Sequence, residues 1–338
     1  IVELYQILIS PDQPNQELVN SATNELTELY KRPETFEILI NLYSEASDQN
    51  ILLLVAIGIK YILLNEEIWN FFRDNNQSEN VKTALLQILQ NEQNPHLFEN
   101  FVESSFPVLR TDFSTWPEYL ELTQSYSLNE EKFLFSIMMS NAMLRSMVNM
   151  SEEDNDYLAN TWEFFTNLAL QGLSSSDDEI IKRSSELVAN LFMFVNITDT
   201  NLPDLFSALF QVFTSLVERE SPICGSVVSS FEIISEVPDF FFPNSLEIAE
   251  QFLPLLMNPS TDANLKCLLL KPLISFLFSD EETDKSGIIG NLYEIIFSVS
   301  SESFNENVCK DEQEDMLVCN DNLERLLEER EGDEMRHL

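Results

Sequence analysis

The apolar residues of this chain recur at steps of three and four positions, in segments of about 12 to 18 residues separated by short polar or proline-bearing breaks. This spacing is typical of amphipathic α-helices. The segments come in successive pairs. The predicted pairs are 18–30 with 34–46, 50–64 with 79–92, 95–110 with 115–127, 130–147 with 157–173, 177–195 with 202–218, 222–237 with 245–257, and 261–278 with 288–298.

The pairs return every ~40 to 47 residues, which is the period of HEAT and armadillo arrays. A two-helix hairpin cannot bury both of its faces alone, so each pair must stack on the next. Only 6 Gly occur, and no long alternation of apolar and polar residues lies between Gly turns, which disfavours a β-rich fold. The sequence therefore predicts an all-α fold, an α-solenoid (superhelix) of HEAT repeats with about seven helix pairs and the start of another.

The same pattern divides the chain into four parts. We expect repeats 1 to 3 in residues 1–125, repeats 4 to 7 in 126–300, an acidic loop or insertion in 301–320, and the start of a further repeat in 321–338. Because the chain begins at Ile1 and ends in a charged segment, we expect a fragment of something longer.

Three segments allow finer predictions. Residues 50–64 are apolar nearly all round, which is typical of a helix buried between neighbours. Thr115 is the expected N-cap of a helix opened by Trp116 and Pro117. The segment 79–92 shows one apolar stripe, made of Val81, Ala84, Leu85, Ile88 and Leu89.

Three consecutive phenylalanines, Phe240, Phe241 and Phe242, lie between two prolines in the stretch "VPDFFFPNS". We interpret this stretch as the corner between the helices of the sixth pair, with Asn244 or Ser245 as the cap of the second helix. An aromatic run at such a corner is usually core, so packing is favoured over ligand contact.

The chain carries 58 acidic and 18 basic residues, for a net charge of −40. Its 44% hydrophobic content with 25 Phe still requires a folded core. This charge disfavours direct nucleic-acid binding and attracts basic partner proteins instead. The most acidic stretch, residues 305–334, is either a solvated linker or a site for a basic partner.

Candidate chemistry is sparse. Of the two histidines, His96 follows Pro95 at a helix entry and His337 lies in the terminal tail. No glycine-rich phosphate loop or nucleophile elbow occurs, so we predict no enzyme, no catalytic residue and no cofactor. No uncharged apolar run reaches the ~18 residues that span a bilayer, which predicts a soluble intracellular chain.

The cysteines are far apart and form no Cys-x-x-Cys pair. We therefore expect neither a metal site nor a disulfide framework, and interpret them as buried or idle thiols. They are Cys224, Cys267, Cys309 and Cys319.

Several strings, taken in order, resemble the importin-beta (karyopherin-beta) superfamily of nuclear transport receptors. "SPDQPNQELVNSATNELTEL" followed by "PETFEILINLY" is similar to its first repeat, "LLLVAIGIKYILL" with Trp69 to its second, and "STWPEYLEL" to its third. "SSFEIISEVPDFFFPNSLEIAEQFLPLL", then "LKCLLLKPLISFL" and "NDNLERLLEE", resemble the sixth to eighth repeats of the beta-3 type.

The resemblance implies the N-terminal part of a receptor that shuttles between cytoplasm and nucleus through the nuclear envelope. It implies binding of the small GTPase Ran in its GTP form on 34–43, 79–90 and 116–125, of basic cargo on the concave face, and of Phe-Gly nucleoporins on the outer face. Trp116 is expected to pack. The implied Ran contacts, expected to be exposed, are Glu37, Asn41, Glu79, Lys82, Glu118 and Glu121. The implied acidic contacts for a basic partner are Asp311, Glu312, Glu314 and Asp315.

On this basis the chain is expected to be part of a nuclear import receptor that releases basic cargo when Ran-GTP binds, because the two ligands favour different curvatures or overlapping surfaces. Two alternatives remain open. One is a scaffold of the HEAT or armadillo kind without dependence on Ran, and the other is an exportin of the same superfamily.

Overall fold

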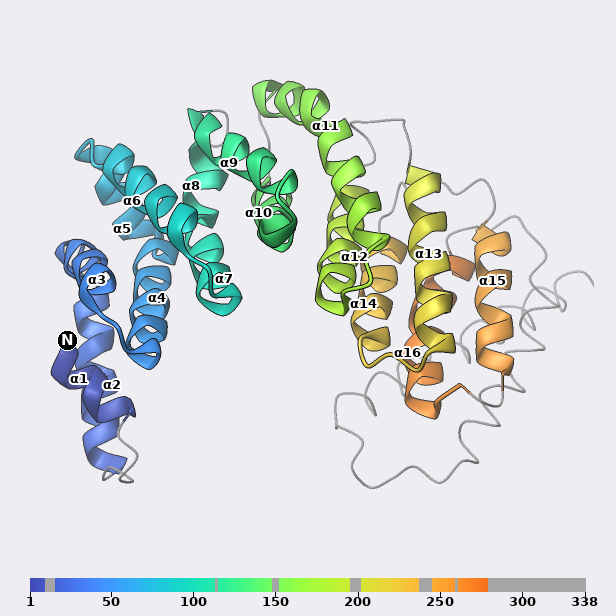
Figure 1. Cartoon of the computed structure of the whole chain (residues 1–338), viewed down its shortest axis with the longest axis horizontal. Coiled ribbons are helices and arrows are strands. Elements are labelled where there is room, and N and C mark those ends of the chain that lie inside the picture. Colours follow the sequence, from blue (N-terminus) through green and yellow to red (C-terminus); the bar gives the residue numbers. More distant parts are fainter. Residues whose placement is uncertain are drawn as a thin grey trace, which may run out of the picture. The chain divides into compact units, whose positions relative to one another are not determined.

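The computed structural model describes residues 1–9, 16–112, 115–147, 152–194, 202–236, 245–258 and 261–278. Within these ranges the chain is built from helices and contains no strand, which confirms the all-α prediction (Figure 1). The chain divides into two compact units, Ile1–Leu168 and Ala169–Leu338. The boundary falls inside α11 (Glu152–Leu173).

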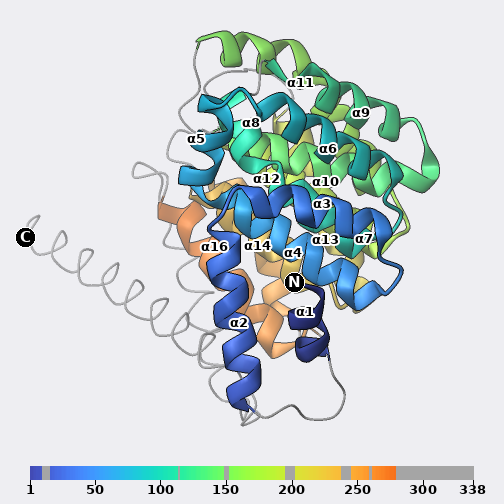
Figure 2. The same cartoon turned by 90° about the vertical axis from the view of Figure 1, so that its left-hand side faces the viewer.

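The first unit stacks its helices in two layers (Figure 2). Helices α1, α4, α7 and α10 contact one another in succession, while α3, α6 and α9 form the second layer. Each repeat thus contacts the next one along the chain, as in a helical-repeat array. The helices are α1 (Val2–Ile9), α2 (Gln16–Tyr30), α3 (Glu34–Glu45), α4 (Gln49–Leu64), α5 (Glu66–Asp74), α6 (Ser78–Asn91), α7 (Pro95–Ser104), α8 (Phe106–Asp112), α9 (Pro117–Ser127), the 3₁₀ turn η2 (Glu130–Lys132) and α10 (Phe133–Ser146).

Helix α4 is the centre of the first unit. It packs against α1, α2, α3, α5, α7 and α8. Its side chains Val55, Ile59 and Ile62 are fully buried, which confirms that the nearly all-apolar segment 50–64 lies between neighbours. Asp48 begins the helix, because its carboxylate accepts hydrogen bonds from the backbone N–H groups of Asn50 and Ile51.

The second unit repeats the two-layer packing. Helix α14 (Cys224–Ser235) packs against both α12 (Asp178–Phe192) and α16 (Ala263–Phe278). Helices α13 (Leu202–Glu218) and α15 (Ser245–Met257) cover this row. Phe210 of α13 and Phe231 of α14 both meet the ring of Phe252 in α15 edge-on, at centroid distances of 5.1 and 5.2 Å. Such aromatic contacts stabilise packing beyond their buried area.

The structure differs from the predicted pairs in three places. It adds the short helices α1 and α5, and it splits the segment 95–110 into α7 and α8. Pro107 explains the split, because its ring nitrogen cannot donate the hydrogen bond that a continuous helix requires. The N-cap position of α9 is Trp116, with no side-chain cap, so the prediction of Thr115 at that position is wrong.

Several predictions lie outside the described residues. They concern the second helix of the seventh pair at 288–298, the Phe240–Phe242 corner with Asn244, the parts 301–320 and 321–338, and the four acidic residues from Asp311 to Asp315. Within the described residues, none of the helices combines the length and the apolar character that crossing a bilayer requires.

Candidate binding surface on α3, α6 and α9

The second layer of the first unit presents an acidic surface. Helix α3 carries three glutamates, α6 one and α9 two, against a single lysine, Lys82. Glu37 and Asn41 of α3, Glu79 of α6, and Glu118 and Glu121 of α9 are all exposed, as predicted. Figure 2 shows the three helices in order along one side of the unit. A partner that lies across them meets carboxylates from three successive repeats.

A groove separates α3 from α6. Its volume is about 500 Å³, within the range of roughly 300–1,000 Å³ that is typical of ligand pockets. The floor is apolar and includes Phe36, Ile40 and Val81, while Glu34 and Glu37 stand on the rim. A groove of this kind suits an apolar side chain that has a cation beside it.

Helix α5, which the sequence analysis did not predict, forms one end of this groove. Phe72 is 5% exposed and meets the ring of Phe36 edge-on, with centroids 5.6 Å apart. Its neighbour Phe71 also lines the groove but is 41% exposed. A signal for α5 was present in the sequence: Asn65 caps the helix through the backbone N–H of Glu67.

Glu92 holds the far ends of α3 and α6 together. Its carboxylate accepts a hydrogen bond from the Tyr43 hydroxyl of α3 and from the backbone N–H groups of Gln93 and Asn94, at 2.8 and 2.7 Å. Burial, followed by the hydrogen bond and negative charge of Glu92, raises the pKa of Tyr43. The tyrosine therefore remains a neutral donor, and the carboxylate is not free to meet a partner.

The prediction that Lys82 is exposed is wrong. Only 4% of its side chain is exposed, and its Nζ donates to Glu79 Oε1 at 2.9 Å. The physical reason is helical spacing, because residue 82 lies three positions before Leu85 and seven before Leu89, on the buried side of α6. The buried ammonium of Lys82 therefore neutralises part of the negative charge of Glu79, and Lys82 is not an exposed contact residue.

Helix α9 is anchored through its buried side. Trp116 is 2% exposed, as expected for a packing residue, and its ring centroid lies 4.9 Å from that of Tyr119. Tyr126 donates its hydroxyl to Leu89 O of α6 at 2.8 Å. Burial raises the pKa of Tyr157 in α11, and the negative charge of Glu121 adds to this shift. Glu121 thus lies near α11, at the edge of the acidic surface.

No group of three or more His, Cys, Asp or Glu side chains is placed to hold a metal ion in the described part of the chain. Cys224 is a buried thiol whose pKa is raised by burial, and the thiol of Cys267 is half-buried. The predicted acidic residues Asp311, Glu312, Glu314 and Asp315 cannot be related to this surface, since they lie outside the described residues.

Comparison with known proteins adds little. No protein-family model matches the chain, and no curated protein matches it. Among solved structures, one similar chain is the crystal structure of an engineered protein from the Northeast Structural Genomics Consortium. It has a TM-score of 0.32 and 12% sequence identity, and the match covers 95% of this chain and 98% of that one.

Proposed function

We propose that this chain is a helical-repeat binding protein that holds a basic partner on α3, α6 and α9. The observation that carries the proposal is the row of exposed carboxylates on three successive helices beside an apolar groove. The resemblance to importin-beta supports a narrower proposal. In it the partner is Ran in its GTP form, and the chain belongs to a nuclear import receptor that passes the pore on Phe-Gly nucleoporins and releases basic cargo.

The electrostatics support a basic partner. Exposed glutamates on one surface attract lysine-rich and arginine-rich surfaces, and accelerate association more than they strengthen the final complex. Each exposed pair adds only about 0.2–1 kcal/mol, so the apolar groove must supply part of the affinity. Phe71 and Ile38, at 41% and 52% exposure, are large apolar side chains that such a partner would cover.

The proposed mechanism is coupled binding without chemistry. Ran-GTP and cargo would favour different curvatures of the array, so Ran-GTP would lower the affinity for cargo, and cargo would lower the affinity for Ran-GTP by the same factor. A helical-repeat array suits this coupling, since each repeat contacts only its neighbours and the array bends through small changes between them.

The test is a titration of the whole chain against Ran loaded with GDP or with a non-hydrolysable GTP analogue, at two salt concentrations. The proposal predicts tighter binding of the GTP form, and a loss of affinity at higher salt because exposed charges are screened. Binding of a basic peptide but of neither Ran form would leave a basic-partner scaffold and overturn the Ran proposal. Cargo binding that requires Ran-GTP would identify an exportin.

Charge variants locate the surface. The triple variant Glu37→Gln, Glu118→Gln, Glu121→Gln should weaken binding about tenfold, from roughly 0.5 kcal/mol for each exposed carboxylate. The matched control is Glu25→Gln, Glu67→Gln, Glu131→Gln, which removes the same charge from exposed positions on α2, α5 and η2. Equal weakening by both sets would mean that net charge alone attracts the partner.

A further inference from the structure

A second cavity in the first unit is lined by cations. It has a volume of about 330 Å³ and lies among the C-terminal ends of α4 and α10 and the helices α5 and α8. Arg110, in the last turn of α8, and Arg145, in the last turn of α10, both line it. We call this cavity the arginine pocket. It brings two guanidinium groups together in a chain with 58 acidic and only 18 basic residues.

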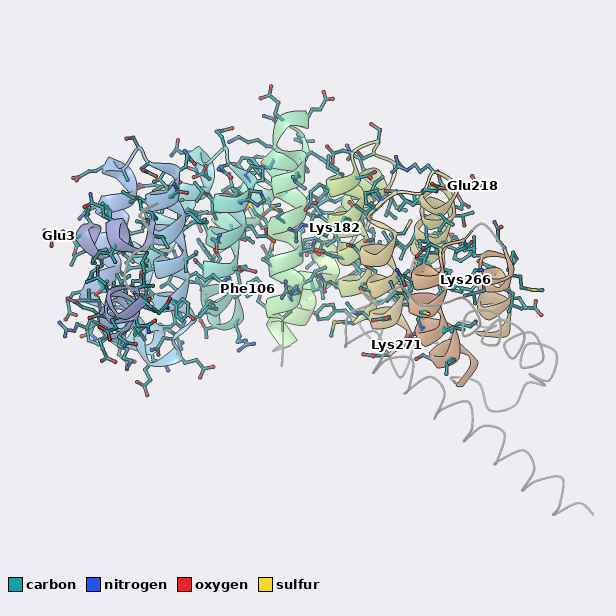
Figure 3. All side chains as sticks on the ribbon, turned by 90° about the horizontal axis from the view of Figure 1, so that it is seen from below. Glu3, Phe106, Lys182, Glu218, Lys266 and Lys271 are labelled. Atoms are coloured by element: carbon teal, nitrogen blue, oxygen red, sulfur yellow. The ribbon has the colours of Figure 1, made fainter. Side chains whose placement is uncertain are left out.

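Both arginines are exposed, and neither forms an ion pair with a described residue. Other cations of the same unit are paired: Lys60 with Glu103 and Lys31 with Glu28. The Arg145 guanidinium lies over the ring of Phe106, 5.2 Å from its centroid (Figure 3 labels Phe106). This cation–π contact orients one face of the group and leaves its N–H donors available.

The rest of the pocket combines an apolar wall with polar groups. Leu64, Phe106 and Pro107 contribute apolar surface, whereas Trp69 lines the pocket with a side chain that is only 2% exposed. The indole Nε1 of Trp69 donates to Thr111 Oγ1 at 2.9 Å, which fixes the ring against α8. One carboxylate, Glu66, also lines the pocket, from the first turn of α5. Among the residues that the structure describes, the lining therefore carries two positive charges against one negative charge.

Two independent reasons favour a ligand with both acidic and apolar groups. Arginine presents a planar fork of donors that matches a carboxylate, and unpaired guanidinium groups gain most from such a partner. Leu64, which is 44% exposed, also adds apolar surface that a neighbouring apolar side chain of the ligand would cover. Interaction with the helix dipoles accounts for an arginine at each helix end, but not for the convergence of both on one cavity.

We propose that the arginine pocket binds an acidic peptide segment of a partner protein, with a carboxylate held between Arg110 and Arg145 and a neighbouring apolar side chain against Leu64. This site differs in charge from the acidic surface and needs no Ran. Helix α5 separates the two, since Trp69 and Asn70 line the arginine pocket whereas Phe71 and Phe72 line the groove beside α3.

The test is fluorescence anisotropy of the whole chain with a short labelled peptide of glutamates around one central phenylalanine. Saturable binding that weakens with salt is expected, and the glutamine counterpart of the peptide should not bind. A third peptide, with phosphoserine in place of glutamate, separates phosphate from carboxylate recognition. Absence of saturable binding, equal binding of the glutamine peptide, or a preference for the phosphoserine peptide would overturn the proposal.

Three single variants and one control locate the site. Arg110→Gln and Arg145→Gln should each weaken binding about tenfold, because a hydrogen bond to a charged group is lost. Glu66→Gln should strengthen binding, since it removes a repelling carboxylate from the lining. Arg73→Gln is the control, with the same charge change at an α5 residue outside the lining. Unchanged affinity in both pocket variants, or equal loss in the control, contradicts the assignment. If an arginine variant unfolds, the effect of Glu66→Gln on the affinity for the peptide still tests the proposal.

Discussion

Replacing Gly58 by alanine should destabilise the first unit, although alanine is the better helix former. An added Cβ at residue 58 of α4 would lie 2.9 Å from Leu39 Cδ1 and 3.0 Å from two ring carbons of Tyr30. Neither neighbour gives way easily. Leu39 is fully buried, and the Tyr30 hydroxyl is hydrogen-bonded to that of Tyr5 at 2.8 Å. Because Leu39 belongs to α3, the strain also reaches the helix that carries Glu37.

The magnitude follows from two opposing effects. Overpacking a filled core lowers the free energy of unfolding by about 1–3 kcal/mol, and the higher helix propensity of alanine raises it by about 1 kcal/mol. The net loss of stability is therefore about 0–2 kcal/mol. The matched control is Gly225→Ala in α14. Among the described residues, its Cβ would meet Leu268 Cδ1 alone, at an ordinary 3.6 Å. That variant keeps the propensity gain, so it should stabilise the second unit by up to about 1 kcal/mol.

Hydrogen–deuterium exchange is the suitable assay, since it reports each unit separately in a chain where one unfolding free energy is not well defined. Amides of α4 should exchange faster in Gly58→Ala, and amides of α14 more slowly in Gly225→Ala. If Gly58→Ala protects α4 as strongly as Gly225→Ala protects α14, the close approach of α4 to α2 and α3 is wrong.

Two further predictions follow. Burial is the main cause that raises the pKa values of Tyr5, Tyr30, Tyr43 and Tyr119, so their folded-state pKa values exceed the ~10 of an unfolded chain. The stability they provide is complete below pH ~10 and is lost as pH rises above it, so the tyrosinate absorbance of these four residues should appear together with unfolding; ionisation of all eight tyrosines in a fully helical chain would contradict this. Lys82→Met keeps the buried stem and removes a charge beneath Glu79, so binding of the basic partner should not weaken; a clear loss in titration would show that Lys82 contacts it.

The helices were largely predictable, because they depend on local spacing. The segments 202–218 and 245–257 match α13 and α15 at both ends. The breaks were harder to predict. Pro107 divides α7 from α8, and Asn65 starts α5 directly after α4, although both residues are visible in the sequence. The apolar stripe is strong on both sides of Pro107 and of Asn65, so helical periodicity alone does not reveal these breaks.

The candidate surface was predictable only in part. The exposure expected of the contacts that the family resemblance implied is confirmed at Glu37, Asn41, Glu79, Glu118 and Glu121, since each stands off the apolar stripe of its helix. The expectation fails at Lys82 because a lysine can place its long aliphatic stem on a buried face. The groove and the arginine pocket were not predictable, since they form where helices that are distant in sequence approach one another.

Hydrogen–deuterium exchange of the chain with and without Ran loaded with the GTP analogue tests the central claim most directly. The account predicts slower exchange in α3, α6 and α9, where the carboxylates and the groove lie, and little change in α14 and α16 of the second unit. Binding that slows exchange elsewhere and leaves α3, α6 and α9 unchanged would contradict it.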